Sequence, residues 1–165
     1  MKKFLAISAA MMLLAQVPAQ ACGDKLLSMA RMISLFKAYK PYKTASILIY
    51  QVHKDSVVKD KQFQTSLTLA GHKIKTVDKA DQLDSTLSAG KFDLVLTDIG
   101  DAAALKQQLA SRTAAPSILP LLVKPAKEEL IAAEKQYGVV IKTPGGYTDH
   151  LAAIDHMMKL LAHKT

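Results

Sequence analysis

The stretch KFDLVLTDI, residues 91–99, decides the fold of this chain. Its centre, from Phe92 to Thr97, is a short and mostly apolar run. It lacks the strict alternation of apolar and polar residues that is typical of a strand with one solvent-exposed face. Such runs are typical of strands that are buried on both faces of a sheet. A strand of this kind needs helices on both of its sides, so the stretch predicts an α/β domain.

Four further short apolar runs flank this stretch at regular intervals: Ser46 to Tyr50, Ile74 to Val77, Ile118 to Val123 and Val139 to Ile141. The segments between the five runs carry apolar residues three and four positions apart, which indicates helices. Glycines such as Gly71 and Gly138 close these helices. Strands that alternate with helices predict a five-stranded parallel sheet covered on both faces.

Two motifs make residues 44–165 resemble the receiver domain of bacterial response regulators. Residues 91–99 are similar to the third receiver strand, which ends in the phospho-acceptor aspartate, here Asp98. Residues 138–144, GVVIKTP, are similar to the fifth strand with its lysine, here Lys142, and a following proline. The resemblance implies a flavodoxin-like sheet of strand order 2-1-3-4-5.

The chain departs from the receiver pattern where the phosphoryl chemistry would take place. Receivers hold Mg²⁺ with a pair of acidic residues after the first strand, but residues 50–53 read Tyr-Gln-Val-His. Receivers also end the fourth strand with Ser or Thr, whereas residues 121–125 read Leu-Leu-Val-Lys-Pro. Magnesium needs several hard oxygen ligands, and phosphoryl transfer depends on that metal. We therefore expect a degenerate receiver that is not an enzyme and that has no metal or cofactor.

Polar residues at the carboxyl ends of the predicted strands form a weak candidate ligand site. Open α/β sheets bind ligands at this edge. The candidate residues are Asp98, Asp101, Gln51, His53, Lys124 and Lys142. The alternative for the two aspartates is that Asp98 or Asp101 caps the following helix through its first-turn N–H groups.

The last helix predicts a weak partner surface. One apolar stripe on this helix should face the sheet, and a second stripe, formed by Ala153, Met157 and Leu160, needs another cover. A protein partner or a second copy of the chain is one such cover. Another is an extra N-terminal helix within residues 22–43, a basic segment in which apolar residues recur at helical spacing.

Residues 1–21 are predicted to be a cleaved secretory signal. Two lysines precede an apolar core, and Ala19-Gln20-Ala21 has the small-x-small pattern of a cleavage site. We expect the mature chain to begin at Cys22, the only cysteine, in the periplasm or an equivalent exported space. Residues 19–21 make a poor lipobox, so we expect a free thiol or an intermolecular disulfide and no lipid anchor.

Composition narrows the class of protein further. The predicted mature chain has 144 residues, the size of one domain, and a net charge of +6. After signal removal no segment is long and apolar enough to span a membrane. No cluster of aromatic and basic residues indicates nucleic-acid binding. Two hypotheses remain: a non-catalytic module that binds a protein partner or itself, and a small-ligand binder with its site at the carboxyl edge.

Overall fold

The computed structural model describes residues 34, 39–54 and 56–163. The predicted signal peptide lies outside these residues, as does most of the segment for which an extra N-terminal helix was predicted. Among the described residues, no helix combines the length and the apolar character that crossing a bilayer requires.

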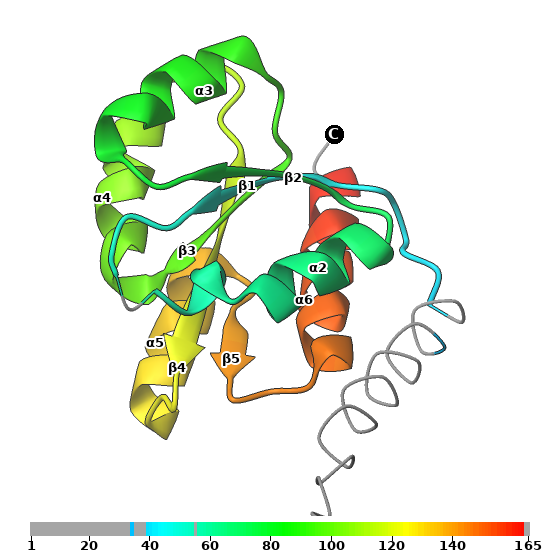
Figure 1. Ribbon diagram of the computed structural model, residues 1–165. Helices are drawn as coiled ribbons and strands as arrows, with labels where there is room; N and C mark the ends of the chain where they lie inside the picture. The colour runs from blue at the N-terminus through cyan, green and yellow to red at the C-terminus, as the bar shows by residue number, and fades with distance from the viewer. Residues whose placement is uncertain (1–33, 35–38, 55, 164–165) are drawn as a thin grey trace, which may run out of the picture.

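A single parallel sheet forms the centre of the structure. Its strands are β1 (Ser46–Tyr50), β2 (Lys73–Val77), β3 (Leu94–Asp98), β4 (Ser117–Val123) and β5 (Ile141–Thr143), and they lie in the order β2-β1-β3-β4-β5 (Figure 1). The predicted α/β class and the strand order 2-1-3-4-5 are confirmed. The fold is compatible with the flavodoxin-like fold.

Helices cover both faces of this sheet. Helices α2 (Lys61–Leu69) and α6 (Tyr147–Ala162) lie on one face, and α3 (Leu83–Ala89), α4 (Ile99–Leu109) and α5 (Lys127–Tyr137) lie on the other (Figure 1). Two short 3₁₀ turns, η1 (Val57–Lys59) and η2 (Ala80–Gln82), precede α2 and α3.

The core consists of two apolar layers because successive strand residues point to opposite faces. In β1, for example, Ile47 and Ile49 face α2 and α6, whereas Leu48 faces α3 and α4. All three residues are fully buried. This explains why the strands read as continuous apolar runs in the sequence.

The fifth strand begins two residues later than the sequence pattern predicted. Gly138 ends α5 with φ of 82°, a conformation that favours glycine. Val139 and Val140 are buried but only connect α5 to the sheet, and the register with β4 starts where Ile141 pairs with Leu121. The strand ends at Thr143, immediately before the turn into α6.

The segment before β1 is tied to helix α6. The backbone N–H of Tyr42 donates to the carboxylate of Asp155 at 3.0 Å, and the Tyr39 hydroxyl donates to the carbonyl of Leu151 at 3.4 Å. The Lys159 ammonium lies 5.7 Å from the centre of the Tyr42 ring. These contacts lie on the flank of α6 that carries Leu151, Asp155 and Lys159, away from the predicted stripe of Ala153, Met157 and Leu160.

Candidate functional site

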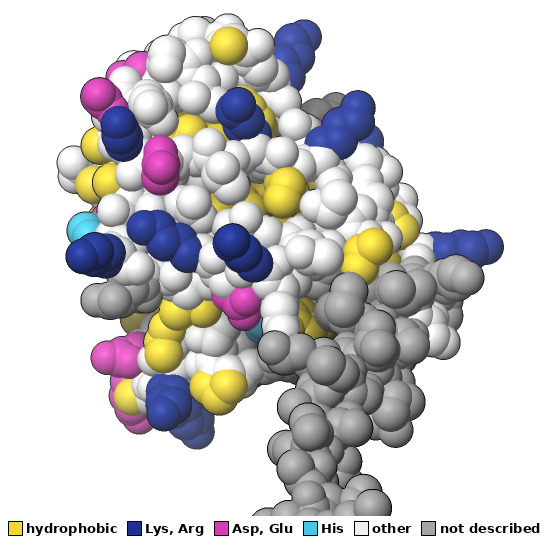
Figure 2. Space-filling model, viewed as in Figure 1, with side chains coloured by type: hydrophobic (Ala, Val, Ile, Leu, Met, Phe, Trp, Pro, Cys, Tyr) yellow, Lys and Arg dark blue, Asp and Glu magenta, His cyan; other side chains and the backbone are white. Residues whose placement is uncertain are grey.

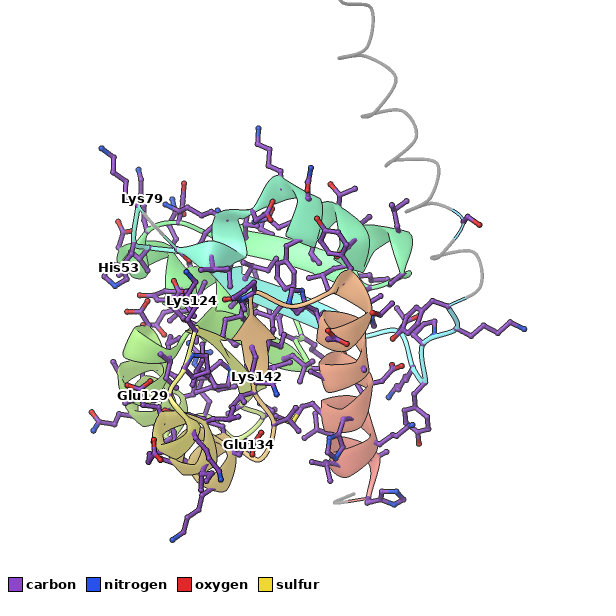
Figure 3. The ribbon with its side chains drawn as sticks, turned by 90° about the horizontal axis from the view of Figure 1, so that it is seen from below. His53, Lys79, Lys124, Glu129, Glu134 and Lys142 are labelled. Atoms are coloured by element: carbon purple, nitrogen blue, oxygen red, sulfur yellow. The ribbon has the colours of Figure 1, made fainter. Side chains whose placement is uncertain are left out.

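All six predicted ligand-site residues lie at or near the carboxyl edge of the sheet. Gln51 and His53 follow β1, Asp98 ends β3, and Asp101 lies in the first turn of α4. Lys124 follows β4, and Lys142 is the central residue of β5. Figure 3 shows His53, Lys124 and Lys142 spread across this edge, from the β1 side to the β5 side, without converging on one point.

Of these residues, only His53 and Asp101 contact each other. The imidazole Nε2 of His53 lies 2.9 Å from Oδ1 of Asp101, and the two side chains are 69% and 19% exposed. The second carboxylate oxygen of Asp101 is buried and has no hydrogen-bond partner among the described residues. Burial and the nearby Asp101 carboxylate raise the pKa of the Tyr50 hydroxyl. The carboxylate can hold the exposed imidazole in one orientation.

Asp98 occupies the N-cap position of α4, but its side chain accepts no capping hydrogen bond. The side chain is half-buried at the end of the central strand. Asp101 lies inside the first turn of α4 and is directed to His53. The side-chain capping that was the alternative interpretation of Asp98 is therefore not formed in this structure, although a negative charge at this helix end is favourable.

The remaining predicted residues have local roles. The side-chain oxygen of Gln51 accepts a hydrogen bond from Nε2 of Gln64 at 2.9 Å. The backbone N–H of Lys124 donates to the carbonyl of Thr143 at 2.6 Å, and Lys124 adopts φ of 45°. The side chains of Lys124 and Lys142 are exposed. The ligand-site assignment therefore remains a prediction, with one formed contact within it.

An apolar hollow of about 480 Å³ lies at the same edge, between the ends of β3 and β4. It is lined by Val57, Asp98, Ile99, Leu121, Leu122, Val123, Pro125 and Glu129. Two of the lining residues, Ile99 and Val123, are 38% and 55% exposed. Asp98 is the only one of the six predicted residues that lines this hollow. Sequence reasoning missed the site, although an apolar Val123 directly before Lys124-Pro125 was a signal for it.

The structure separates the three residues of the predicted partner surface on α6. Met157 is 4% exposed and belongs to the core beneath α2 and α6, Ala153 is half-buried, and Leu160 is 36% exposed. Leu160 and Met157 also line an apolar groove of about 360 Å³ together with Leu109, Ile118, Tyr137 and Leu161, among others. The partner surface remains a prediction, but only Leu160 offers a large, well-exposed side chain for it.

No known protein-family model matches this chain, and none of the curated proteins matches it. The structure itself shows a five-stranded parallel α/β fold that is compatible with the flavodoxin-like class. Many unrelated functions use folds of this class, so the function has to be inferred from the residues at the edges of the sheet.

Proposed function

We propose that this chain is an exported, non-catalytic, receiver-like module that binds a protein partner or a second copy of itself. The supporting observation is the apolar hollow at the carboxyl edge, where open α/β sheets hold their ligands. A site that binds a phosphate and a metal is polar, whereas Ile99 and Val123 expose aliphatic surface here. Exposed apolar surface next to a hollow is typical of protein interaction sites.

The side chains around Asp98 also support a role without phosphoryl transfer. Magnesium prefers near-octahedral oxygen ligands, and such sites use at least one or two carboxylates. Gln51 and His53 occupy the positions that follow β1, and His53 engages the Asp101 carboxylate. The acidic pair that would hold a metal beside Asp98 in a receiver is thus replaced by an amide and an imidazole.

A second candidate function is the binding of a small polar ligand, and the His53–Asp101 contact favours it. An imidazole that a carboxylate orients, with 69% of its side chain exposed, can donate or accept a hydrogen bond toward a ligand. This site lies on the β1 side of the edge and shares no residue with the apolar hollow.

A photoreactive amino acid placed at Val123 tests the proposal in the cells of origin. Ile131 on α5 is the matched control because it is exposed to the same extent, 54% against 55% for Val123. We expect a discrete protein adduct from position 123 and none from position 131. Ile99→Glu should abolish this adduct, because a carboxylate is costly to bury at an apolar interface.

Adducts of equal yield from both positions, or an adduct that survives Ile99→Glu, would contradict the proposal. Acetyl phosphate and Mg²⁺ should leave the yield unchanged, and a change would show that phosphoryl chemistry persists at Asp98. If a small molecule instead copurifies with the chain in native mass spectra and is lost in His53→Ala, the second candidate is the correct one.

A further inference from the structure

The outer edge of β2 carries unpaired backbone groups. Among the strands of the described residues, β2 is the last on its side of the sheet and pairs with β1 alone. The N–H of Lys73 donates to Ala45 and the carbonyl of Val77 accepts from Gln51, both at 2.9 Å, so residues 73, 75 and 77 turn their backbone groups toward β1. The N–H and C=O groups of Ile74 and Thr76 therefore point away from the sheet. Neither residue has a hydrogen-bond partner for these groups within the described ranges.

The side chains of β2 differ on its two faces. Lys73 and Lys75 are exposed and share a face with Val77, which packs in the α3 and α4 layer. On that face a hollow of about 490 Å³ lies between β2 and α3, lined by Lys75, Ser85, Thr86, Ala89, Gly90 and Phe92. On the other face Ile74 is half-buried against the α2 layer and Thr76 is exposed. An added strand would thus meet lysines and open space on one face and β-branched residues on the other.

Strand β2 carries two lysines and no acidic residue, and the part of the chain that contains it is basic. Residues 39–80 contain eight lysines and three aspartates, whereas residues 81–163 contain eight basic and ten acidic residues. In the part of the chain that the structure describes, the two ion pairs are His53–Asp101 and Arg112–Asp84, so no lysine of the β2 edge is in one. Figure 2, which has the view of Figure 1, shows Lys and Arg side chains spread over the face that carries α2, with Asp and Glu side chains among them.

We infer that the outer edge of β2 binds an extended acidic segment of another protein, which pairs with Ile74 and Thr76 as a sixth strand. The inference rests on the proposed role in partner binding and gives the chemistry of the partner. Main-chain hydrogen bonds supply affinity in this mode, and alternate side chains supply specificity. Acidic residues at every second position would oppose Lys73 and Lys75, and β-branched residues between them would oppose Ile74 and Thr76.

The same edge disfavours a second copy of the chain. Pairing two β2 edges would bring Lys73 and Lys75 of both copies together without any acidic residue between them, and like charges across a strand pair are destabilising. Lysines on edge strands generally prevent such self-association. They block neutral and basic strands but attract an acidic one, so the edge selects its partner by charge.

Synthetic peptides test this inference on the ¹⁵N-labelled, full-length mature chain. The probe is the capped peptide Glu-Val-Glu-Val-Glu, and the charge control is Lys-Val-Lys-Val-Lys. At saturation with the acidic peptide, amide exchange at Ile74 and Thr76 should slow by on the order of tenfold, since these N–H groups become hydrogen-bonded. The basic peptide should leave both exchange rates unchanged.

Two N-methylated forms of the acidic peptide separate strand pairing from charge attraction. One form carries the methyl groups on the valine amides and the other on the glutamate amides. Only alternate amides of an added strand face β2, so one form should lose binding and the other should retain it. Equal binding of both forms, or no protection of Ile74 and Thr76 by the acidic peptide, would overturn the inference.

Variants of β2 complete the test. Lys73→Glu with Lys75→Glu should reverse the preference toward the basic peptide, whereas Lys127→Glu with Lys135→Glu on α5 should not. Thr76→Pro removes one outward N–H and should weaken binding at least severalfold, with Thr76→Val as its matched control. If Thr76→Pro proves unfolded by circular dichroism, the charge-reversal pair still decides the result. Peptide-induced shifts confined to Val123 and Ile99 would overturn strand addition and leave the proposed function standing.

Discussion

Two histidines, His72 and His150, are buried in this domain with 3% and 6% of their surface exposed. Nδ1 of His72 accepts a hydrogen bond from the N–H of Ala45 at 3.2 Å, and the ring of His150 meets Phe63 edge-on at 5.2 Å. Burial lowers the pKa of both imidazoles, and it outweighs the opposing influence of Asp155 on His72. For His150 the opposing groups are the Lys142 carbonyl, Asp149 and Asp60, and they are also outweighed. Both rings are therefore neutral in the folded protein at neutral pH.

The chain should lose stability as the pH falls below about 6.5, the ordinary pKa of histidine. A histidine whose pKa is lowered by folding takes up its proton more readily in the unfolded state, so acid favours unfolding. Thermal melts from pH 8 to pH 5 should show a smaller decline in Tm for His150→Gln than for the unchanged chain. The exposed His156, replaced by Gln, is the matched control and should keep the full decline. Equal declines in all three proteins would mean that His150 does not contribute.

Among the elements, the strands were the most predictable and the ends of the strands the least. Apolar runs such as 46–50 and 94–98 reflect burial on both faces, which is a property of the sheet as a whole and is visible in one sequence. The start of β5 was missed because Val139 and Val140 are as apolar as a strand but serve as a connection. An apolar residue in the sequence indicates burial but not strand structure. The start of β5 is defined by backbone pairing, which begins where Ile141 pairs with Leu121.

The candidate site was less predictable because it depends on how strand ends from distant parts of the sequence face one another. Sequence order placed Asp98, Asp101 and His53 at one edge, and the structure adds the contact between the last two. It did not show that Ile99 and Val123 line a common hollow, because these residues lie in separate βα units. The predicted strand order already placed β2 at one end of the sheet, but the sequence did not show that the backbone groups of Ile74 and Thr76 are the ones that face outward.

Met157 and Leu160 lie three positions apart on helix α6, and their substitution by lysine should affect stability differently. Met157 is 4% exposed in the core, so Met157→Lys should destabilise the fold by about 3 kcal/mol or more, because a charge cannot be buried there without a partner. Leu160 is 36% exposed, so Leu160→Lys should change stability by no more than about 0.5 kcal/mol. Urea unfolding of both variants checks this. A folded Met157→Lys with unchanged stability would show that Met157 is not a core residue.

For the molecule as a whole, charge divides the chain into two parts. The basic part, residues 39–80, includes the edge strand β2, its neighbour β1 and helix α2. The part that follows is slightly acidic and contributes all but one of the residues that line the apolar hollow at the ends of β3 and β4. We expect the two surfaces to be used by partners of different chemistry, since one offers positive charge and backbone groups and the other offers aliphatic side chains.

Export should leave a mature chain that begins at Cys22 and carries a single thiol. The apolar core of residues 4–17 and the sequence Ala19-Gln20-Ala21 fit recognition by signal peptidase, which needs small residues just before the cut. The intact mass of the protein from the periplasm should therefore correspond to residues 22–165. Ala21→Arg should block the cut and leave the precursor in the membrane fraction, while Ser28→Arg should be processed normally.

One thiol per chain should react with a maleimide after mild reduction, because Cys22 has no second cysteine in the chain to pair with. A retained Met1, or a mass increment from diacylglycerol on Cys22, would contradict this assignment.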